Sequence, residues 1–243
     1  MSDLVTRDVE YLHDGTRMVG YLCAPADARR SAGVLLVHDA FGVSPDMVAV
    51  AHRLADLGHA VLVADVWGDR TLPATQPEIG PLIGGMVTDR PRWMGRLAAA
   101  HEAAGGQPEI DGSRLVVLGY CFGGSSALEY VRTGGAVLGA VAVHAGLDLL
   151  APDWSARTPD ARVLVCTGSA DPMATAAMRT ELQDAMTAAD VDWELDLYSG
   201  AKHAFTSPRS QDSPTPDVVA YDPRAAARSW DATTRFLREL LPA

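Results

Sequence analysis

Short apolar segments recur along the chain, and most are nearly continuous runs of Val, Leu and Ala rather than alternations of apolar and polar residues. A continuous run predicts a strand that is covered on both faces, as in a parallel sheet. This feature constrains the fold most, because a parallel sheet needs helices on both of its faces. The runs lie at residues 33–39, 60–65, 114–119, 136–144 and 162–167, and a further candidate strand lies near 192–199.

Helical patterns fill the gaps between these runs. Apolar residues recur at helical spacing in residues 45–57, 178–189 and 226–240. Ser44-Pro45 predicts the start of the first of these helices and Gly58 predicts its end. Strands that alternate with helices predict a doubly wound α/β fold.

The N-terminal segment has a different pattern. Residues 4–12 and 16–23 alternate more between apolar and polar side chains, and Asp14-Gly15 lies between them. Asp-Gly between two such runs predicts an antiparallel hairpin, here at the edge of the sheet. Because α/β folds of 243 residues are routinely one domain, we expect a single domain over residues 1–243.

The charge balance limits the partners that we expect. The chain has 20 basic and 31 acidic residues, a net charge of −11, and its one lysine is Lys202. Binding to nucleic acid needs clustered Lys and Arg, so no nucleic-acid partner is expected. No run of apolar residues is long enough to span a membrane. The sequence leaves the oligomeric state open.

The N-terminus and the cysteines predict the compartment. Met1-Ser2-Asp3-Leu4 lacks the basic and apolar regions of a signal peptide. Three cysteines are an odd number, which disfavours a disulfide framework and fits a reducing environment. We therefore expect a cytoplasmic protein.

The strongest chemical motif is Gly119-Tyr120-Cys121-Phe122-Gly123-Gly124, which ends one apolar run and opens a helical pattern near 122–132. This is the Gly-x-nucleophile-x-Gly elbow, with cysteine in the place where serine is commoner. Residues without a Cβ allow the strand and the helix to close around a strained nucleophile. The helix N-terminus favours negative charge on a thiol or an oxyanion.

A nucleophile of this kind needs a histidine base and an acid that orients it, in the chain order nucleophile, acid, histidine. Asp171 follows the strand at 162–167, and His203 follows the strand near 192–199. Both therefore stand in loops at strand ends and in the required order. Asp148, in the loop after 136–144, is the alternative for the acid.

The remaining histidines have structural interpretations. His38 and His144 end core strands, where a histidine usually has its hydrogen bonds satisfied within the core. The other four, which are expected in turns or on helices and in contact with solvent, are His13, His52, His59 and His101. No residues have the spacing of zinc ligands, so no metal site is predicted.

Two segments rich in Pro do not fit regular structure, residues 67–91 and 204–223. Each follows a candidate strand and is expected at the carboxyl edge of the sheet, where α/β folds bind ligands. Irregular loops in that position are commonly pocket walls or lids, and plain surface loops are the alternative.

These residues resemble the dienelactone hydrolases, the carboxymethylenebutenolidase branch of the α/β hydrolases, from about residue 8 to 240. The resemblance rests on the motifs at residues 38–42, 119–124, 168–171 and 200–205. It implies a Cys121–His203–Asp171 triad, an oxyanion hole formed by the backbone N–H groups of Phe122 and Ala40, and no cofactor. Phe41 and Phe205, with Phe122 and Trp67, are candidate pocket walls.

The chain departs from the family pattern at two positions. Asp39 stands where the family typically has a Glu that holds the resting thiol away from the histidine. Ser207 stands where the members that cleave dienelactone have an arginine for the substrate carboxylate. The candidate replacements are Arg209, which is the nearest arginine, and Arg70, Arg90 and Arg92, for which a solvated surface position is favoured.

The sequence therefore predicts a cysteine-dependent hydrolase of small carboxylic esters or lactones that acts through a thioacyl-enzyme. Two other interpretations remain. The first is a thiol-based redox or binding protein, which the lack of a Cys-x-x-Cys motif disfavours. The second is an inactive hydrolase fold that serves as a binding module, which the complete set of nucleophile, acid and base disfavours.

Overall fold

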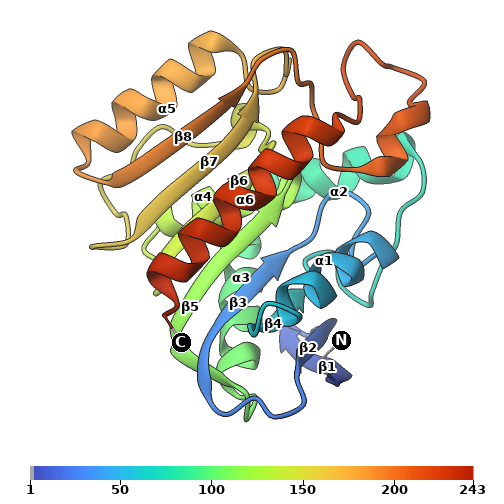
Figure 1. Cartoon of the computed structure of the whole chain (residues 1–243), viewed down its shortest axis with the longest axis vertical. Helices are drawn as coiled ribbons and strands as arrows, with labels where there is room; N and C mark the ends of the chain where they lie inside the picture. The colour runs from blue at the N-terminus through green and yellow to red at the C-terminus, as the bar shows by residue number, and fades with distance from the viewer. Residues whose placement is uncertain (1–2, 243) are drawn as a thin grey trace. The chain divides into compact units, whose positions relative to one another are not determined.

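The computed structural model describes residues 3–242, so Met1 and Ser2, which belong to the N-terminal segment considered above, lie outside it together with Ala243. It contains a sheet in the order β1-β2-β4-β3-β5-β6-β7-β8 (Figure 1). The strands are β1 Leu4–His13, β2 Thr16–Pro25, β3 Ser31–Val37, β4 Ala60–Ala64, β5 Ile110–Tyr120, β6 Gly139–Val143, β7 Arg162–Gly168 and β8 Asp192–Tyr198. The helices are α1 Pro45–Ala55, α2 Gln76–Thr88, α3 Arg90–Gly105, α4 Phe122–Arg132, α5 Ala176–Ala188 and α6 Pro223–Leu240.

The predicted fold class is confirmed by the strand pairing. β3 pairs with β4, β6 with β7 and β7 with β8, all in parallel, whereas β1–β2 and β2–β4 are antiparallel. The chain divides into two compact units, Met1–Val117 and Leu118–Ala243. They are described separately, and a single domain over the whole chain stays a prediction.

In the first unit, the edge hairpin forms as predicted. Asp14 and Gly15 have φ angles of 47° and 75°, the left-handed conformations that a type I′ turn requires at both central residues. Helix α1 contacts β2 and β4, and α3 contacts β1, β3 and β4. Ser44 lies at the N-cap of α1 as predicted, but its hydroxyl makes no capping hydrogen bond.

The prediction of an irregular segment at residues 67–91 is wrong for its second half, which forms helix α2. Thr75 and Glu78 form a reciprocal capping box at its start. Pro77 lies in the first turn of α2 and Pro91 in the first turn of α3, where a missing N–H costs no helical hydrogen bond. Two of the prolines that suggested a loop therefore mark helix starts.

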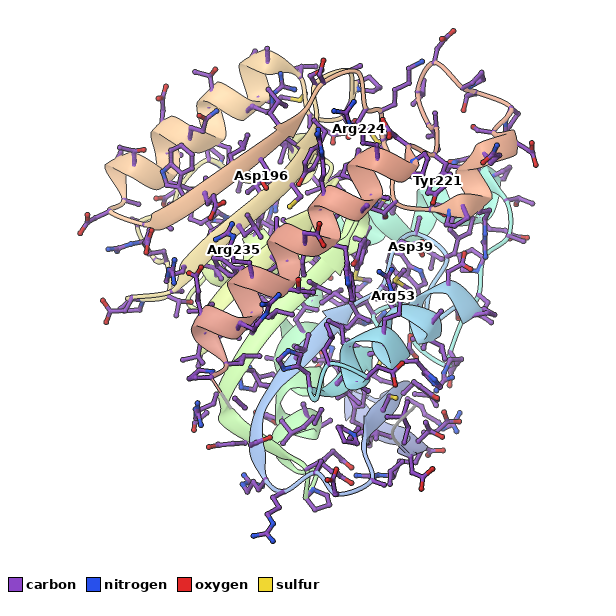
Figure 2. The ribbon with its side chains drawn as sticks, in the orientation of Figure 1. Asp39, Arg53, Asp196, Tyr221, Arg224 and Arg235 are labelled. Carbon is purple, nitrogen blue, oxygen red and sulfur yellow. The ribbon has the colours of Figure 1, made fainter. Side chains whose placement is uncertain are left out.

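The second unit holds β6, β7 and β8 with helices on both faces. Figure 1 shows α6 in front of the sheet, where it contacts β6 and β7, and α4 behind it, against β6. Arg235 of α6, labelled in Figure 2, pairs with Glu194 of β8, and this ion pair joins the helix to the edge strand. Arg235 also pairs with Glu239 of the same helix over 3.1 Å. Between β8 and α6 the chain is irregular as predicted, apart from the short 3₁₀ helix Pro208–Asp212.

Among the helices of residues 3–242, none combines the length and the apolar character that crossing a bilayer requires.

Candidate active site

Cys121 lies at the sharp turn between β5 and α4, as the elbow motif predicts. Its φ and ψ angles are 54° and −119°, a conformation that costs a non-glycine residue about 1–3 kcal/mol. The backbone N–H of Cys121 donates to the carbonyl of Val143 over 3.0 Å, and its carbonyl accepts from Ser125 N–H over 3.2 Å. The strained conformation is therefore held by bonds from β6 and from the first turn of α4.

The glycines of the elbow have a steric role. A Cβ on Gly119 would lie 2.0 Å from the carbonyl oxygen of Gly123, a distance at which no side chain fits. A Cβ on Gly124 would lie 3.0 Å from the Cβ of Ala145. Close approach of strand, helix and the end of β6 thus requires Gly119 and favours Gly124.

His203 follows β8, and the chain that returns toward α6 holds its backbone on both sides. The N–H of His203 donates to the carbonyl of Val218 over 3.1 Å, and the N–H of Ala220 donates to the carbonyl of His203 over 3.2 Å. The His203 ring is buried, with 3% of the residue exposed. The irregular segment before α6 therefore positions the histidine.

Asp171 follows β7 and lies next to His203. Its Oδ2 lies 3.0 Å from Nδ1 of His203, and because a carboxylate only accepts, Nδ1 carries the proton and donates. The other oxygen, Oδ1, accepts from the N–H of Met173 over 2.8 Å. Asp171 is 2% exposed, so its charge is compensated by these donors rather than by water.

The second ring nitrogen of His203 faces the thiol. Nε2 of His203 lies 3.1 Å from Sγ of Cys121, and Cys121 is partly exposed to solvent. Burial alone would lower the pKa of His203, but the Cys121 thiolate and the hydrogen bond with Asp171 outweigh it and raise the pKa to about 10. The three side chains can therefore hold a thiolate–imidazolium pair backed by a carboxylate.

The two candidate acids differ in their contacts and exposure. Asp148 lies exposed in the 3₁₀ helix Leu147–Leu149, whereas Asp171 is the carboxylate in contact with His203. The predicted chain order of nucleophile, acid and histidine thus corresponds to one hydrogen-bonded row.

His144 contacts Cys121 beside this row, although the sequence predicts only a structural role for it. His144, at the end of β6, accepts the N–H of Cys121 at Nδ1 over 3.1 Å, and its Nε2 lies 2.8 Å from Oγ1 of Thr206. Its hydrogen bonds are satisfied in the core, as predicted. The signal that could have identified it is its place at the carboxyl end of the strand next to the elbow.

The aromatic candidates of the second unit are both buried. Phe122 is the first residue of α4 and directly follows Cys121. Phe205 is fully buried, and its ring packs edge-on against His144 and Tyr198, with centroids 5.3 and 5.4 Å away. Their roles in an oxyanion hole and a pocket stay predictions.

Three further candidates, Asp39, Ala40 and Phe41, follow β3 in the first unit; Asp39 is labelled in Figure 2. Oδ1 of Asp39 accepts the N–H of Phe41 over 2.9 Å, and the carbonyl of Ala40 accepts from Trp67 Nε1 over 3.3 Å. His38 is buried and satisfied, as predicted, because its Nε2 accepts the N–H of Val66. That these residues act on Cys121 or on a substrate stays a prediction.

The candidate replacement arginines of the first unit have partners of their own. Arg70 donates to the carbonyls of Val19 and Gly20 and pairs with Asp8 at 2.5 Å. Arg92 pairs with Asp89 at 2.8 Å. The guanidinium of Arg90 lies 5.8 Å from the ring centre of Trp93. In the second unit, Arg209 is exposed on the 3₁₀ helix that follows Ser207.

The four histidines expected in contact with solvent are half-buried, so each is partly exposed. His52 lies 2.7 Å from the hydroxyl of Tyr21, and His101 lies 2.8 Å from the carbonyl of Gly112. The other two are His13 and His59. Within residues 3–242, His, Cys, Asp and Glu side chains form no group of three or more that could hold a metal ion.

A mostly parallel sheet with an antiparallel N-terminal hairpin, carrying a nucleophile elbow, defines an α/β hydrolase. The family model of the dienelactone hydrolase family matches residues 18–241, and the chain belongs to that family. It is therefore a hydrolase of carboxylic esters or lactones.

Individual relatives agree with this assignment. A dienelactone hydrolase-like promiscuous phosphotriesterase from metagenomic libraries is 34% identical, with a TM-score of 0.91 over 98% of this chain and 99% of its own. A protein called m3DLH is 33% identical, with a TM-score of 0.89 over 98% and 99% of the two chains. A carboxymethylenebutenolidase of Rhodococcus opacus is 27% identical over 93% of this chain and 88% of its own.

Proposed function

We propose that the protein hydrolyses small neutral esters or lactones with Cys121 as the nucleophile, His203 as the base and Asp171 as the group that orients His203. The observation that carries this proposal is the unbroken row of contacts, 3.1 Å from Cys121 Sγ to His203 Nε2 and 3.0 Å from His203 Nδ1 to Asp171 Oδ2. Both distances are within the reach that nucleophilic catalysis by a thiol–imidazole pair requires.

In the acylation half-reaction, the Cys121 thiolate attacks the carbonyl carbon and a carbon–sulfur bond forms. The backbone N–H groups of Phe122 and Ala40 stabilise the negative oxygen, and one such donor contributes about 10²–10³ in rate. When the carbon–oxygen bond of the ester breaks, the His203 imidazolium protonates the departing alkoxide. The product is a thioacyl-enzyme with a neutral His203.

In the deacylation half-reaction, neutral His203 takes a proton from water and the resulting hydroxide attacks the thioester. The carbon–sulfur bond breaks, the acid is released, and the thiolate–imidazolium pair is restored. The Asp171 carboxylate, which accepts from Nδ1, keeps Nε2 facing the reacting atoms in both half-reactions. No cofactor enters either step.

The substrate that this proposal favours is uncharged. Ser207 replaces the arginine by which the family binds a substrate carboxylate, and the net charge of −11 repels anions. Phe41 and Phe205 are the proposed apolar walls of the pocket, and Asp39 is the proposed counterpart of the family's thiol-holding Glu.

The test is turnover of p-nitrophenyl acetate and of a small lactone by the purified protein, with intact mass spectrometry after rapid acid quenching. We expect hydrolysis and an acyl adduct on Cys121. Thiol modification without turnover would support the alternative of a redox or binding protein, and neither turnover nor adduct would support an inactive binding module.

A second candidate substrate class is neutral phosphotriesters. It is supported by the 34% identity, over 98% of the chain, to a promiscuous phosphotriesterase. Here the thiolate would attack phosphorus and displace an aryloxide, and water would then cleave the phosphorus–sulfur bond. Release of p-nitrophenolate from p-nitrophenyl diethyl phosphate, and its loss in Cys121→Ala, is the expected result.

A further inference from the structure

His144 occupies an unusual position for a histidine to which the proposed mechanism gives no chemical step. It directly follows β6 and has a φ angle of 38°, in the left-handed region that only a few per cent of non-glycine residues adopt. Its backbone N–H donates to the carbonyl of Cys166 over 2.8 Å, and 2% of the residue is exposed. The backbone is thus anchored to β7 while the ring extends toward the elbow.

The hydrogen bonds of the ring determine its tautomer. Nδ1 lies 3.1 Å from the backbone nitrogen of Cys121, whose N–H is shared between this ring and the carbonyl of Val143. Because a backbone nitrogen can only donate, Nδ1 of His144 is an acceptor and carries no proton. The proton of the neutral ring is therefore on Nε2, which donates to Oγ1 of Thr206 over 2.8 Å. One ring joins the backbone of the nucleophile to the loop that carries His203.

The surroundings of the ring keep it neutral. Burial and the neighbouring His203 lower the pKa of His144 well below its ordinary value. The ring packs against His203, Phe205 and Tyr120, with centroids 5.4, 5.3 and 5.8 Å away. A proton on Nδ1 would also place the N–H of His144 and the N–H of Cys121 opposite each other with no acceptor between them.

We infer that His144 is a positioning residue. Its Nδ1 fixes the strained Cys121, and its bond to Thr206 fixes the loop that carries His203. The thiol and the imidazole are thereby held at reacting distance. The inference rests on the proposed function, because it requires Cys121 and His203 to be the reacting pair. It adds two residues, His144 and Thr206, to those on which the rate depends.

The physical reason is the precision that the reacting pair requires. A misplacement of 1 Å can reduce a rate about 10²-fold. Thr206 is three residues after His203. The N–H of the strained Cys121 has two acceptors, His144 Nδ1 and the carbonyl of Val143, so removal of His144 leaves it with one. Loss of either hydrogen bond of His144 therefore lets one partner move relative to the other without changing the groups that bind substrate.

Three substitutions separate the two hydrogen bonds of His144. His144→Phe keeps the ring packing but removes both bonds. His144→Asn places an acceptor near the Nδ1 position and does not reach Thr206, whereas His144→Gln reaches toward Thr206 and has no acceptor near Nδ1. We expect kcat to fall about 10–100-fold in His144→Phe, while KM changes by less than about threefold. The fall in kcat should be smaller in His144→Asn and His144→Gln, because each keeps one of the two bonds.

Thr206 allows the same test without changing the left-handed residue. Thr206→Val removes the acceptor and keeps the shape, and Thr206→Ser keeps the hydroxyl. We expect kcat to fall about 2–10-fold in Thr206→Val, which corresponds to the loss of one hydrogen bond. In Thr206→Ser, kcat should return to the value of the unmodified protein. In the double variant His144→Phe, Thr206→Val, kcat should be no lower than in His144→Phe alone, because that substitution already removes the bond to Thr206.

The outcomes distinguish this inference from the proposed function. Each variant is assayed with p-nitrophenyl acetate, and its folded fraction is measured by circular dichroism. Full activity of Cys121→Ala would overturn the proposed function and this inference with it. An inactive Cys121→Ala combined with an unchanged kcat in both His144→Phe and Thr206→Val would overturn only the inference. The inference would also be overturned if kcat in His144→Phe and Thr206→Val fell only in proportion to the folded fraction and Thr206→Ser did not restore it.

Discussion

Nδ1 of His203 lies 3.0 Å from Oδ2 of Asp171, although 32 residues separate the two in sequence. Asp171 follows β7 and His203 follows β8, and these strands pair in parallel, so both side chains start from the same edge of the sheet. Because Nδ1 donates to the carboxylate, the other nitrogen is left to face Cys121. The pairing of β7 with β8 therefore determines which tautomer His203 adopts.

Asp171→Asn should reduce kcat by up to about 10⁴-fold, the loss seen when the acid of a Ser-His-Asp triad becomes an amide. The amide removes the negative charge and can stabilise the wrong tautomer of His203. Asp148→Asn is the matched control, since Asp148 is exposed and should tolerate the change. Initial rates of both folded variants test this, and a greater loss in Asp148→Asn would show that the acid is misassigned.

Cys121→Ala should abolish ester hydrolysis, whereas Cys23→Ala and Cys166→Ala should retain most of it. Burial raises the pKa of Cys23 to about 11 and that of Cys166 to about 12, so neither is a thiolate near neutral pH. The measurement is the initial rate per folded protein for the three variants. Retained activity in Cys121→Ala would contradict the proposed mechanism.

Much of the fold and of the candidate site was predictable from local signals. Buried parallel strands are continuous apolar runs, and the elbow needs glycine at position 119 for steric reasons that act over four residues. The order of Cys121, Asp171 and His203 in the sequence follows from the order of the strands that carry them. These features depend on short segments, which the sequence displays directly.

The errors have a different origin. Proline is common both in loops and at helix starts, so the residue type alone does not show that Pro77 and Pro91 lie in the first turns of α2 and α3. The contacts of His144 with Cys121 and Thr206 join residues 23 and 62 positions away. No local pattern encodes such a contact, because it depends on how three strand ends meet.

Gly119→Ala should prevent correct folding of the elbow and lower the free energy of unfolding by more than about 3 kcal/mol. The added Cβ would lie 2.0 Å from the carbonyl oxygen of Gly123, which is backbone and cannot move alone. Gly84→Ala is the matched control: it lies inside α2, has no atom within 4 Å of the added Cβ, and should stabilise by about 0.5–1 kcal/mol. Urea unfolding of both variants provides the comparison, and equal effects would contradict the steric argument.

The pH dependence of stability should reveal the charged His203. Its pKa is about 10 in the folded protein and about 6.5 in an unfolded chain, so its charged form stabilises the fold fully below about pH 6.5. That contribution is lost as the pH rises toward 10. The gap in unfolding free energy between the unmodified protein and Asp171→Asn should therefore narrow from pH 6 to pH 10. A constant or widening gap in urea unfolding would show that the hydrogen bond with Asp171 does not help to hold His203 in its charged form.

The unmodified protein should prefer a neutral lactone to the anionic dienelactone, and Ser207→Arg should shift this preference toward the anion. A substrate carboxylate without a guanidinium partner lacks a charge-assisted hydrogen bond, and this loss weakens binding by about 10–150-fold. Ser207 is the half-buried N-cap of the 3₁₀ helix Pro208–Asp212. The measurement is kcat/KM for cis-dienelactone and for an uncharged lactone of similar size, with Ser207→Lys as the control for charge without a bidentate group. A strong preference of the unmodified protein for dienelactone would mean that another cation, Arg209 first among them, binds the carboxylate.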